Sequence, residues 1–151
     1  MNEQLLEAAQ FTGKAGRIAE STLGMAHATL HALIAATAQL YEAAEDFEHA
    51  EEFYLKSIKV TESTLKEDDA NVARAMDAAA SFYVRRMNYE KALELNAKVA
   101  AWTLTHCGER HPVYLAQLTN FAATLKLAQR DEDAAAVEKE IKELRQRMGM
   151  S

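Results

Sequence analysis

The sequence contains little that would interrupt a helix, with one proline and five glycines among 151 residues. It also lacks runs in which Val, Ile, Thr and Tyr alternate with polar residues, the pattern of half-buried strands. Apolar residues make up 49% of the chain, which is enough for a core. Many of them are alanines, which favour helices and close helix–helix contact. These features exclude a β-rich protein and predict an all-α fold.

Cysteine is almost absent, and Cys107 alone cannot form an internal disulfide, which favours a reducing compartment. The formal net charge of −6 argues against a nucleic-acid partner, which would require clustered Lys and Arg. The N-terminal stretch MNEQLLEAAQF is acidic where a secretion signal is basic. No apolar run approaches the ~20 residues of a membrane span. We therefore expect a cytoplasmic protein with neither nucleic-acid nor membrane partners.

The chain repeats itself with a period of 42 residues. Small and aromatic residues recur at this offset in three sets: Ala8, Ala50, Ala92 and Ala134; Ala38, Ala80 and Ala122; and Tyr41 with Tyr83. A fixed period of this length is typical of proteins built from stacked structural repeats. Each period holds two amphipathic segments with helical spacing, so we expect pairs of helices that pack on their neighbours.

Helix-start and helix-stop residues divide the chain into seven expected helices. Asp46, Asn88 and Asp131 are suited to cap the N-termini of three of them. Pro112 suits a first helical turn because its missing N–H needs no partner there, and Gly108 is suited to end a helix. We expect one domain, 1–151, with a half-repeat at 2–24 and repeats at 26–67, 69–108 and 111–148.

The first and last expected helices differ from the others. Gly13 and Gly16 interrupt the first. They either only weaken the helix, which is the more common case, or provide a thin face for the close approach of another helix. The last helix is heavily charged, and we expect ion pairs of Glu138 with Lys142 and of Glu143 with Arg147 on a polar outer face.

The recurring residues resemble tetratricopeptide repeats (TPRs), in the 42-residue variety found in kinesin light chains. The small residue of that family's first helix matches Ala38, Ala80 and Ala122, and its large apolar residue four positions earlier matches Ile34, Met76 and Leu118. The alanine of its second helix matches Ala50, Ala92 and Ala134. The resemblance covers residues 5–148. It implies an α-α superhelix, or TPR solenoid, of seven antiparallel helices in three repeats plus a leading half-repeat.

In this family the first helices of the repeats line a concave groove that binds a partner peptide or helix. Positions that are 42 residues apart form one column of the repeat. Transferred column by column from the family, the candidate peptide-binding residues of this chain are Gln39, Glu42, Arg74, Asp77, Ser81, Arg85, Thr119 and Lys126. The three cations suit an acidic side chain or a C-terminal carboxylate, because arginine binds carboxylates through two parallel hydrogen bonds. The alternative is ordinary solvated helix charge. The resemblance thus implies a non-enzymatic adaptor or scaffold with a protein or peptide partner.

The first helix offers a second candidate surface. It matches the second helix of a repeat, so its own first-helix partner is missing. We expect it to expose Leu5, Ala9, Phe11 and Ile18. A two-fold contact between two chains would cover these residues, and the protein would then be a self-assembly module that forms a homodimer.

Candidate catalytic and metal-binding groups are weak. His27 and His31 have the spacing of a metal-binding pair, but no glutamate lies between them and no third ligand is evident. His106, Cys107 and His111 cluster at a turn, but the column of Cys107 otherwise holds leucines, so we expect it to pack as a small apolar residue. A metal- or thiol-dependent enzyme is therefore a remote alternative. We expect no catalytic residue, metal or cofactor.

Overall fold

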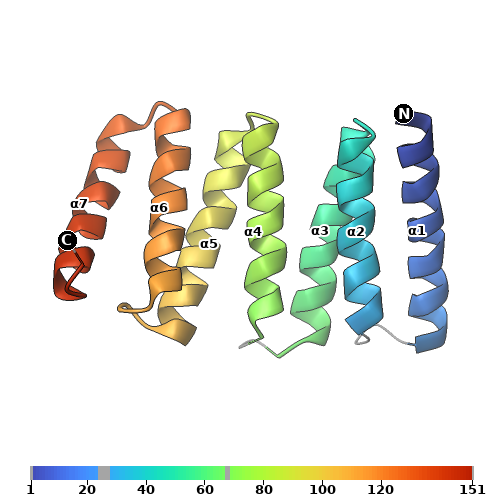
Figure 1. The fold of residues 1–151 in the computed structure, drawn as a ribbon, viewed down its shortest axis with the longest axis horizontal. Helices are drawn as coiled ribbons and strands as arrows, with labels where there is room; N and C mark the ends of the chain where they lie inside the picture. The colour runs from blue at the N-terminus through green and yellow to red at the C-terminus, as the bar shows by residue number, and fades with distance from the viewer. Residues whose placement is uncertain (1, 24–27, 67–68, 151) are drawn as a thin grey trace. The chain divides into compact units, whose positions relative to one another are not determined.

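A computed structural model describes residues 2–23, 28–66 and 69–150 of the chain. These residues form seven α-helices (Figure 1) and contain no strand. The helices are α1 (Asn2–Leu23), α2 (Ala28–Ala43), α3 (Phe47–Thr64), α4 (Ala70–Arg85), α5 (Tyr89–Cys107), α6 (Pro112–Leu127) and α7 (Asp131–Arg147). The expected all-α fold is confirmed.

The chain divides into two compact units, Met1–Ala75 and Met76–Ser151, here called the N-terminal and C-terminal units. The boundary falls inside α4. In the N-terminal unit, α2 packs against both α1 and α3. One core cluster of this unit joins Ala19, Leu30, Ile34 and Val60, with the partly buried Leu33 and Phe53 against them.

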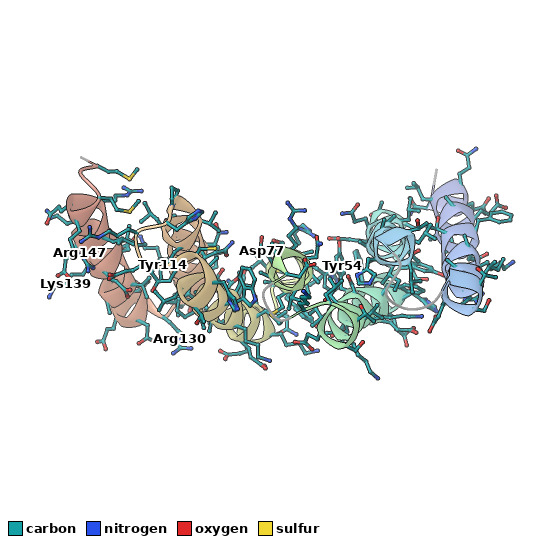
Figure 2. All side chains as sticks on the ribbon, turned by 90° about the horizontal axis from the view of Figure 1, so that it is seen from below. Tyr54, Asp77, Tyr114, Arg130, Lys139 and Arg147 are labelled. Carbon is teal, nitrogen blue, oxygen red and sulfur yellow. The ribbon has the colours of Figure 1, made fainter. Side chains whose placement is uncertain are left out.

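In the C-terminal unit, α6 packs against both α5 and α7. One core cluster joins Tyr114, Leu115 and Leu118 of α6 to Ile141 and Leu144 of α7. A second cluster joins Leu93, Leu125 and Ala134. Tyr114 reaches from α6 towards α7 (Figure 2), where its hydroxyl donates a hydrogen bond to Glu140 Oε1 at 3.2 Å. Burial and the nearby Glu140 carboxylate raise the pKa of Tyr114, so this hydroxyl stays protonated.

The recurring alanines occupy equivalent buried positions. Ala38, Ala80 and Ala122 in α2, α4 and α6 are each at most 4% exposed. In the other column, Ala50, Ala92 and Ala134 of α3, α5 and α7 are fully buried, and Ala8 of α1 is half-buried. A side chain of this size lets two helix backbones approach closely. The 42-residue columns read from the sequence therefore mark positions where neighbouring helices meet.

The turn inside each helix pair is closed by the backbone and repeats with the same period. The three non-glycine residues with left-handed backbone among the described residues are Glu45, Met87 and Gln129, with φ of 62°, 56° and 59°. After each, the next N–H donates at 2.9 Å to the carbonyl five residues earlier: Asp46 to Tyr41, Asn88 to Tyr83 and Arg130 to Leu125. This bond satisfies a carbonyl that the helix end would otherwise leave without a partner.

Helix capping follows the sequence in two of the three turns. Asp46 accepts a hydrogen bond from the N–H of His49, and Asn88 accepts one from the N–H of Lys91, so these N-caps are confirmed. The assignment of Asp131 is wrong: the N-cap of α7 is Arg130, which makes no capping side-chain bond, and Asp131 lies in the first turn. There its carboxylate interacts favourably with the positive end of the helix dipole. Gly108 ends α5 and Pro112 opens α6, as expected.

The two glycines of α1 face the interior of the N-terminal unit. A Cβ at Gly13 would lie 3.6 Å from Phe53 Cζ and 3.7 Å from Thr37 Cγ2, and one at Gly16 would lie 4.0 Å from Leu33 Cβ. These are ordinary van der Waals distances, so the packing of α1 on its neighbours does not require glycine. The structure favours the interpretation in which both glycines only weaken the helix.

Candidate binding clefts

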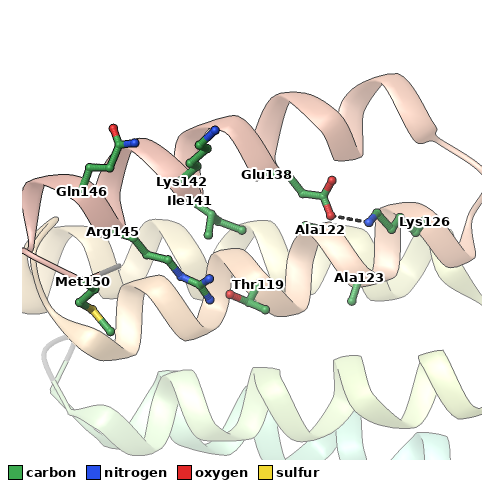
Figure 3. A pocket seen from close by; sticks show the side chains of 10 residues that line it. All are labelled: Thr119, Ala122, Ala123, Lys126, Glu138, Ile141, Lys142, Arg145, Gln146 and Met150. Atoms are coloured by element: carbon green, nitrogen blue, oxygen red, sulfur yellow. Dashed lines mark ion pairs between the residues drawn. The ribbon is translucent and has the colours of Figure 1, made fainter.

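One hollow of the C-terminal unit lies between α6 and α7. This α6–α7 cleft has a volume of about 550 Å³ and is shown in Figure 3. Its apolar part comes from Ala122, Ala123, Ile141 and Met150, and its polar part from Thr119, Lys126, Glu138, Lys142, Arg145 and Gln146. A hollow of this size with a few polar groups over an apolar surface is typical of a ligand-binding site.

Positive charge dominates the rim of the α6–α7 cleft. Lys126 forms an ion pair with Glu138, so the expected pairing of Glu138 with Lys142 is wrong. The reason is that α6 brings Lys126 closer to this carboxylate than the next turn of α7 brings Lys142. The expected pairing of Glu143 with Arg147 is also wrong, because Arg147 forms its ion pair with Glu109 at 2.7 Å. None of the described residues forms an ion pair with Lys142 or Arg145. The Arg145 side chain extends from α7 towards Thr119 of α6 (Figure 3), so its guanidinium lies over the cleft.

A second, smaller cleft of the same unit lies beside α4, α5 and α6. This α4–α6 cleft has a volume of about 310 Å³ and is lined by Asp77, Ser81, Val84, Arg85, Asn96, Asn120, Ala123, Thr124 and Leu127. At its base, the Nδ2 of the buried Asn96 donates to Thr124 Oγ1 at 2.9 Å. Ala123 lines both clefts, so they adjoin along α6.

Asp77 is the acidic residue of the α4–α6 cleft. It is half-buried, and this burial raises the pKa of its carboxyl above the usual value. No neighbouring charge or hydrogen bond contributes to the shift. A carboxylate is therefore held in a partly desolvated place, and none of the described residues supplies a cation to stabilise it.

The sequence-predicted groove residues fall into both units. Asp77, Ser81 and Arg85 line the α4–α6 cleft, and Thr119 and Lys126 line the α6–α7 cleft. Gln39, Glu42 and Arg74 belong to the N-terminal unit. Gln39 and Arg74 are exposed there, and Glu42 Oε2 accepts a hydrogen bond of 2.7 Å from the Tyr54 hydroxyl. One groove containing all eight residues stays a prediction.

Sequence reasoning missed Lys142 and Arg145, which the polar outer face of α7 was expected to contain. A signal was present in the repeat. One period earlier, the same columns hold Ala100 and Thr103, and both are buried. The two cations therefore depart from the repeat at positions that are buried one period earlier.

Solved structures with a similar fold are known. One is the crystal structure of a Podosopora anserina protein described as a kinesin light chain with nearly identical TPR-like repeats. It matches with a TM-score of 0.77 and 20% sequence identity, over 97% of this chain and 69% of that chain. A variant of that protein matches with a TM-score of 0.76 at the same identity and coverage. This chain has the TPR-like repeat fold.

A third TPR-like match is the crystal structure of BtubC (BKLC) from P. vanneervenii. Its TM-score is 0.77 at 21% identity, and the match covers 97% of this chain and 59% of that chain. No family model matches the sequence, and no curated protein gives a match. At these identities the comparison establishes the fold. None of the helices in the described part of this TPR-like chain has the length and apolar character needed to cross a membrane.

The first TPR-like helix exposes part of the surface expected of it. Phe11 and Ile18 are 69% and 63% exposed, and Leu5 is half-buried. The assignment of Ala9 to this surface is wrong, because Ala9 is fully buried. It lies on the opposite side of α1 from the Phe11 and Ile18 positions, which are seven residues apart and share one helix face. Two large apolar side chains therefore remain on the outer side of α1.

Four of the five remaining sequence candidates for a reactive centre lie within the described residues. His27 lies outside the described residues, and His31 Nε2 lies 3.1 Å from the Thr64 hydroxyl. Among the described residues no group of three His, Cys, Asp or Glu side chains could hold a metal ion. The expectation that Cys107 packs as an apolar residue is wrong, because it is exposed at the last position of α5. His106 lies in the same turn and stacks on Trp102.

Proposed function

We propose that this TPR-like repeat protein is a non-enzymatic adaptor that binds an acidic segment of a partner protein in the α6–α7 cleft. The observation that carries the proposal is the pair of cations, Lys142 and Arg145, beside an apolar surface that includes Ile141. Neither cation is neutralised by a described carboxylate. Arginine and lysine placed in this way favour an acidic ligand, and the apolar surface favours a neighbouring apolar side chain.

The fold supports a role in protein interaction. The structural neighbours are TPR-like repeat proteins, including one described as a kinesin light chain. Thr119 and Lys126, which the repeat columns predict to face a ligand, line the cleft together with the two cations of α7. The proposal therefore keeps part of the predicted groove and adds residues from the second helix of the last repeat.

A library of random heptapeptides displayed on beads tests this function. Peptides selected by the wild type are expected to be enriched in Asp and Glu. Lys142→Gln/Arg145→Gln is expected to bind the selected peptides about tenfold more weakly, because a hydrogen bond to a charged group contributes about 1.5–3 kcal/mol and about 1.4 kcal/mol is a factor of ten. Affinities are measured by fluorescence anisotropy.

A matched control removes the same charge elsewhere in the unit. Arg110→Gln/Lys139→Gln replaces one arginine and one lysine, both exposed and outside the two clefts. Lys139 extends outward from α7 (Figure 2). This variant is expected to bind as the wild type does. Equal weakening in both double variants would mean that net charge alone attracts the peptides, and the proposed site would be rejected.

We propose self-association through α1 as a second function, because Phe11 and Ile18 are exposed on one face. A two-fold contact would remove both side chains from water and contribute roughly 25 cal/mol per Å² of apolar area buried. Light scattering at increasing concentration is expected to give the mass of a dimer, and Phe11→Ser/Ile18→Ser the mass of a monomer. A wild type that stays monomeric at high concentration eliminates this function.

A further inference from the structure

The α4–α6 cleft has chemistry of its own that the binding of an acidic segment does not use. Asp77, Ser81 and Arg85 are spaced by four residues along α4 and therefore lie on one face of this helix. All three line the cleft. Asn120 faces it from α6, and its side chain is exposed and makes no hydrogen bond to a described residue.

The carboxylate of Asp77 is the charged group of this cleft for which the described residues provide no counter-charge. Within the described residues no cation pairs with it, and burial raises the pKa of its carboxyl. A cation brought to this place would offset the cost of the partly desolvated charge. Arg85 also lines the cleft, but its backbone lies about 12 Å along the helix from that of Asp77, and Arg85 contributes nothing to the pKa shift of Asp77.

The two clefts adjoin on α6. Thr119 and Asn120 are consecutive residues, yet Thr119 lines the α6–α7 cleft and Asn120 lines the α4–α6 cleft. Ala123, one turn further on, lines both. The side chain of Ala123 is only a methyl group and therefore forms no high ridge between the two clefts. A single extended segment that crosses α6 there would contact both clefts.

We propose that the α4–α6 cleft is a subsite for a lysine or arginine side chain, carried by the same partner segment whose acidic residue contacts Lys142 and Arg145. The cationic head binds the Asp77 carboxylate and donates to the Asn120 side-chain oxygen, which is an acceptor within the same cleft. The ligand is thus a peptide with both a basic and an acidic residue. This inference rests on the proposed function and deepens it.

The heptapeptide library separates the two subsites. The wild type is expected to select peptides enriched in both Lys or Arg and Asp or Glu. Asp77→Asn is expected to lose the basic enrichment and keep the acidic one, while Lys142→Gln/Arg145→Gln is expected to do the reverse. Asp131→Asn, which neutralises an exposed carboxylate of α7 outside both clefts, is the matched control and is expected to select as the wild type does.

A double-mutant cycle then measures the contact itself. One selected peptide is compared with a version in which norleucine replaces its lysine, by titration calorimetry. The wild type is expected to prefer the lysine peptide about tenfold, and Asp77→Asn is expected to bind the two peptides equally. Circular dichroism of Asp77→Asn checks that the variant is folded, as expected when a partly desolvated charge is removed.

The outcomes distinguish this inference from the function on which it rests. Acidic enrichment without basic enrichment in the wild type overturns the Asp77 subsite and leaves the proposed function standing. Equal preference for lysine in the wild type and in Asp77→Asn also overturns it, because the cation then binds elsewhere. A library from which nothing is enriched overturns both.

Discussion

Leu144→Ala is expected to lower the free energy of unfolding by about 2–5 kcal/mol, because it removes a buried leucine and leaves a cavity. The Leu144 side chain is 1% exposed and belongs to the cluster that joins α7 to Leu115 and Leu118 of α6. Chemical denaturation followed by circular dichroism measures the loss. The same contacts hold α7 beside the α6–α7 cleft, so peptide binding is expected to weaken together with stability.

Leu104→Ala is the matched control for this substitution. Leu104 lies in α5 of the same unit and is 43% exposed. The same atoms are removed from a helical position, but no enclosed cavity forms, so the expected change is within about 0.5 kcal/mol. Equal losses in the two variants would contradict the placement of Leu144 in the core.

Ala92→Leu is expected to lower the free energy of unfolding by about 1–3 kcal/mol, although leucine is an excellent helix former. Ala92 is fully buried and belongs to the column that Ala50 and Ala134 share. A larger side chain there forces α5 and its neighbours apart or into strained rotamers. The midpoint of urea denaturation measures the effect.

Ala97→Leu tests whether the effect comes from the column. Ala97 also lies in α5, but it is exposed. Both substitutions add the same atoms and have the same helix propensity, so the exposed one is expected to be neutral within about 0.5 kcal/mol. If Ala92→Leu were as mild, the alanine column would not be a site of close helix packing.

The sequence predicts most of this fold because its strongest signals are local or periodic. Small residues at a fixed offset mark equivalent contacts, and six of the seven alanines of two columns are buried. The N-caps at Asp46 and Asn88 follow from the hydrogen-bonding capacity of one side chain. Asp131 was assigned from its chemistry, whereas the column of Asp46 and Asn88 leads to Arg130, the observed cap position.

The candidate site is predicted less well, because it depends on which side chains face one another across helices. Glu138 pairs with Lys126 of another helix, and spacing within α7 cannot indicate this contact. That pairing leaves Lys142 without the partner expected for it. Arg74 and Arg85 lie in the same helix but in different units, so a shared site for them does not follow from their columns. The equivalent positions of the earlier repeats hold Leu65 and Leu23, yet Cys107 is exposed because it is the last residue of α5.

The turns with left-handed backbone at Glu45, Met87 and Gln129 are stabilised by backbone hydrogen bonds. Among the described residues, no hydrogen bond of these turns involves the side chains of the three residues. Three chemically unrelated residues therefore serve the same bend. These positions are open to exchange: a fluorophore, a cross-linker or a new recognition group could be attached at any of them while the scaffold beneath keeps its form.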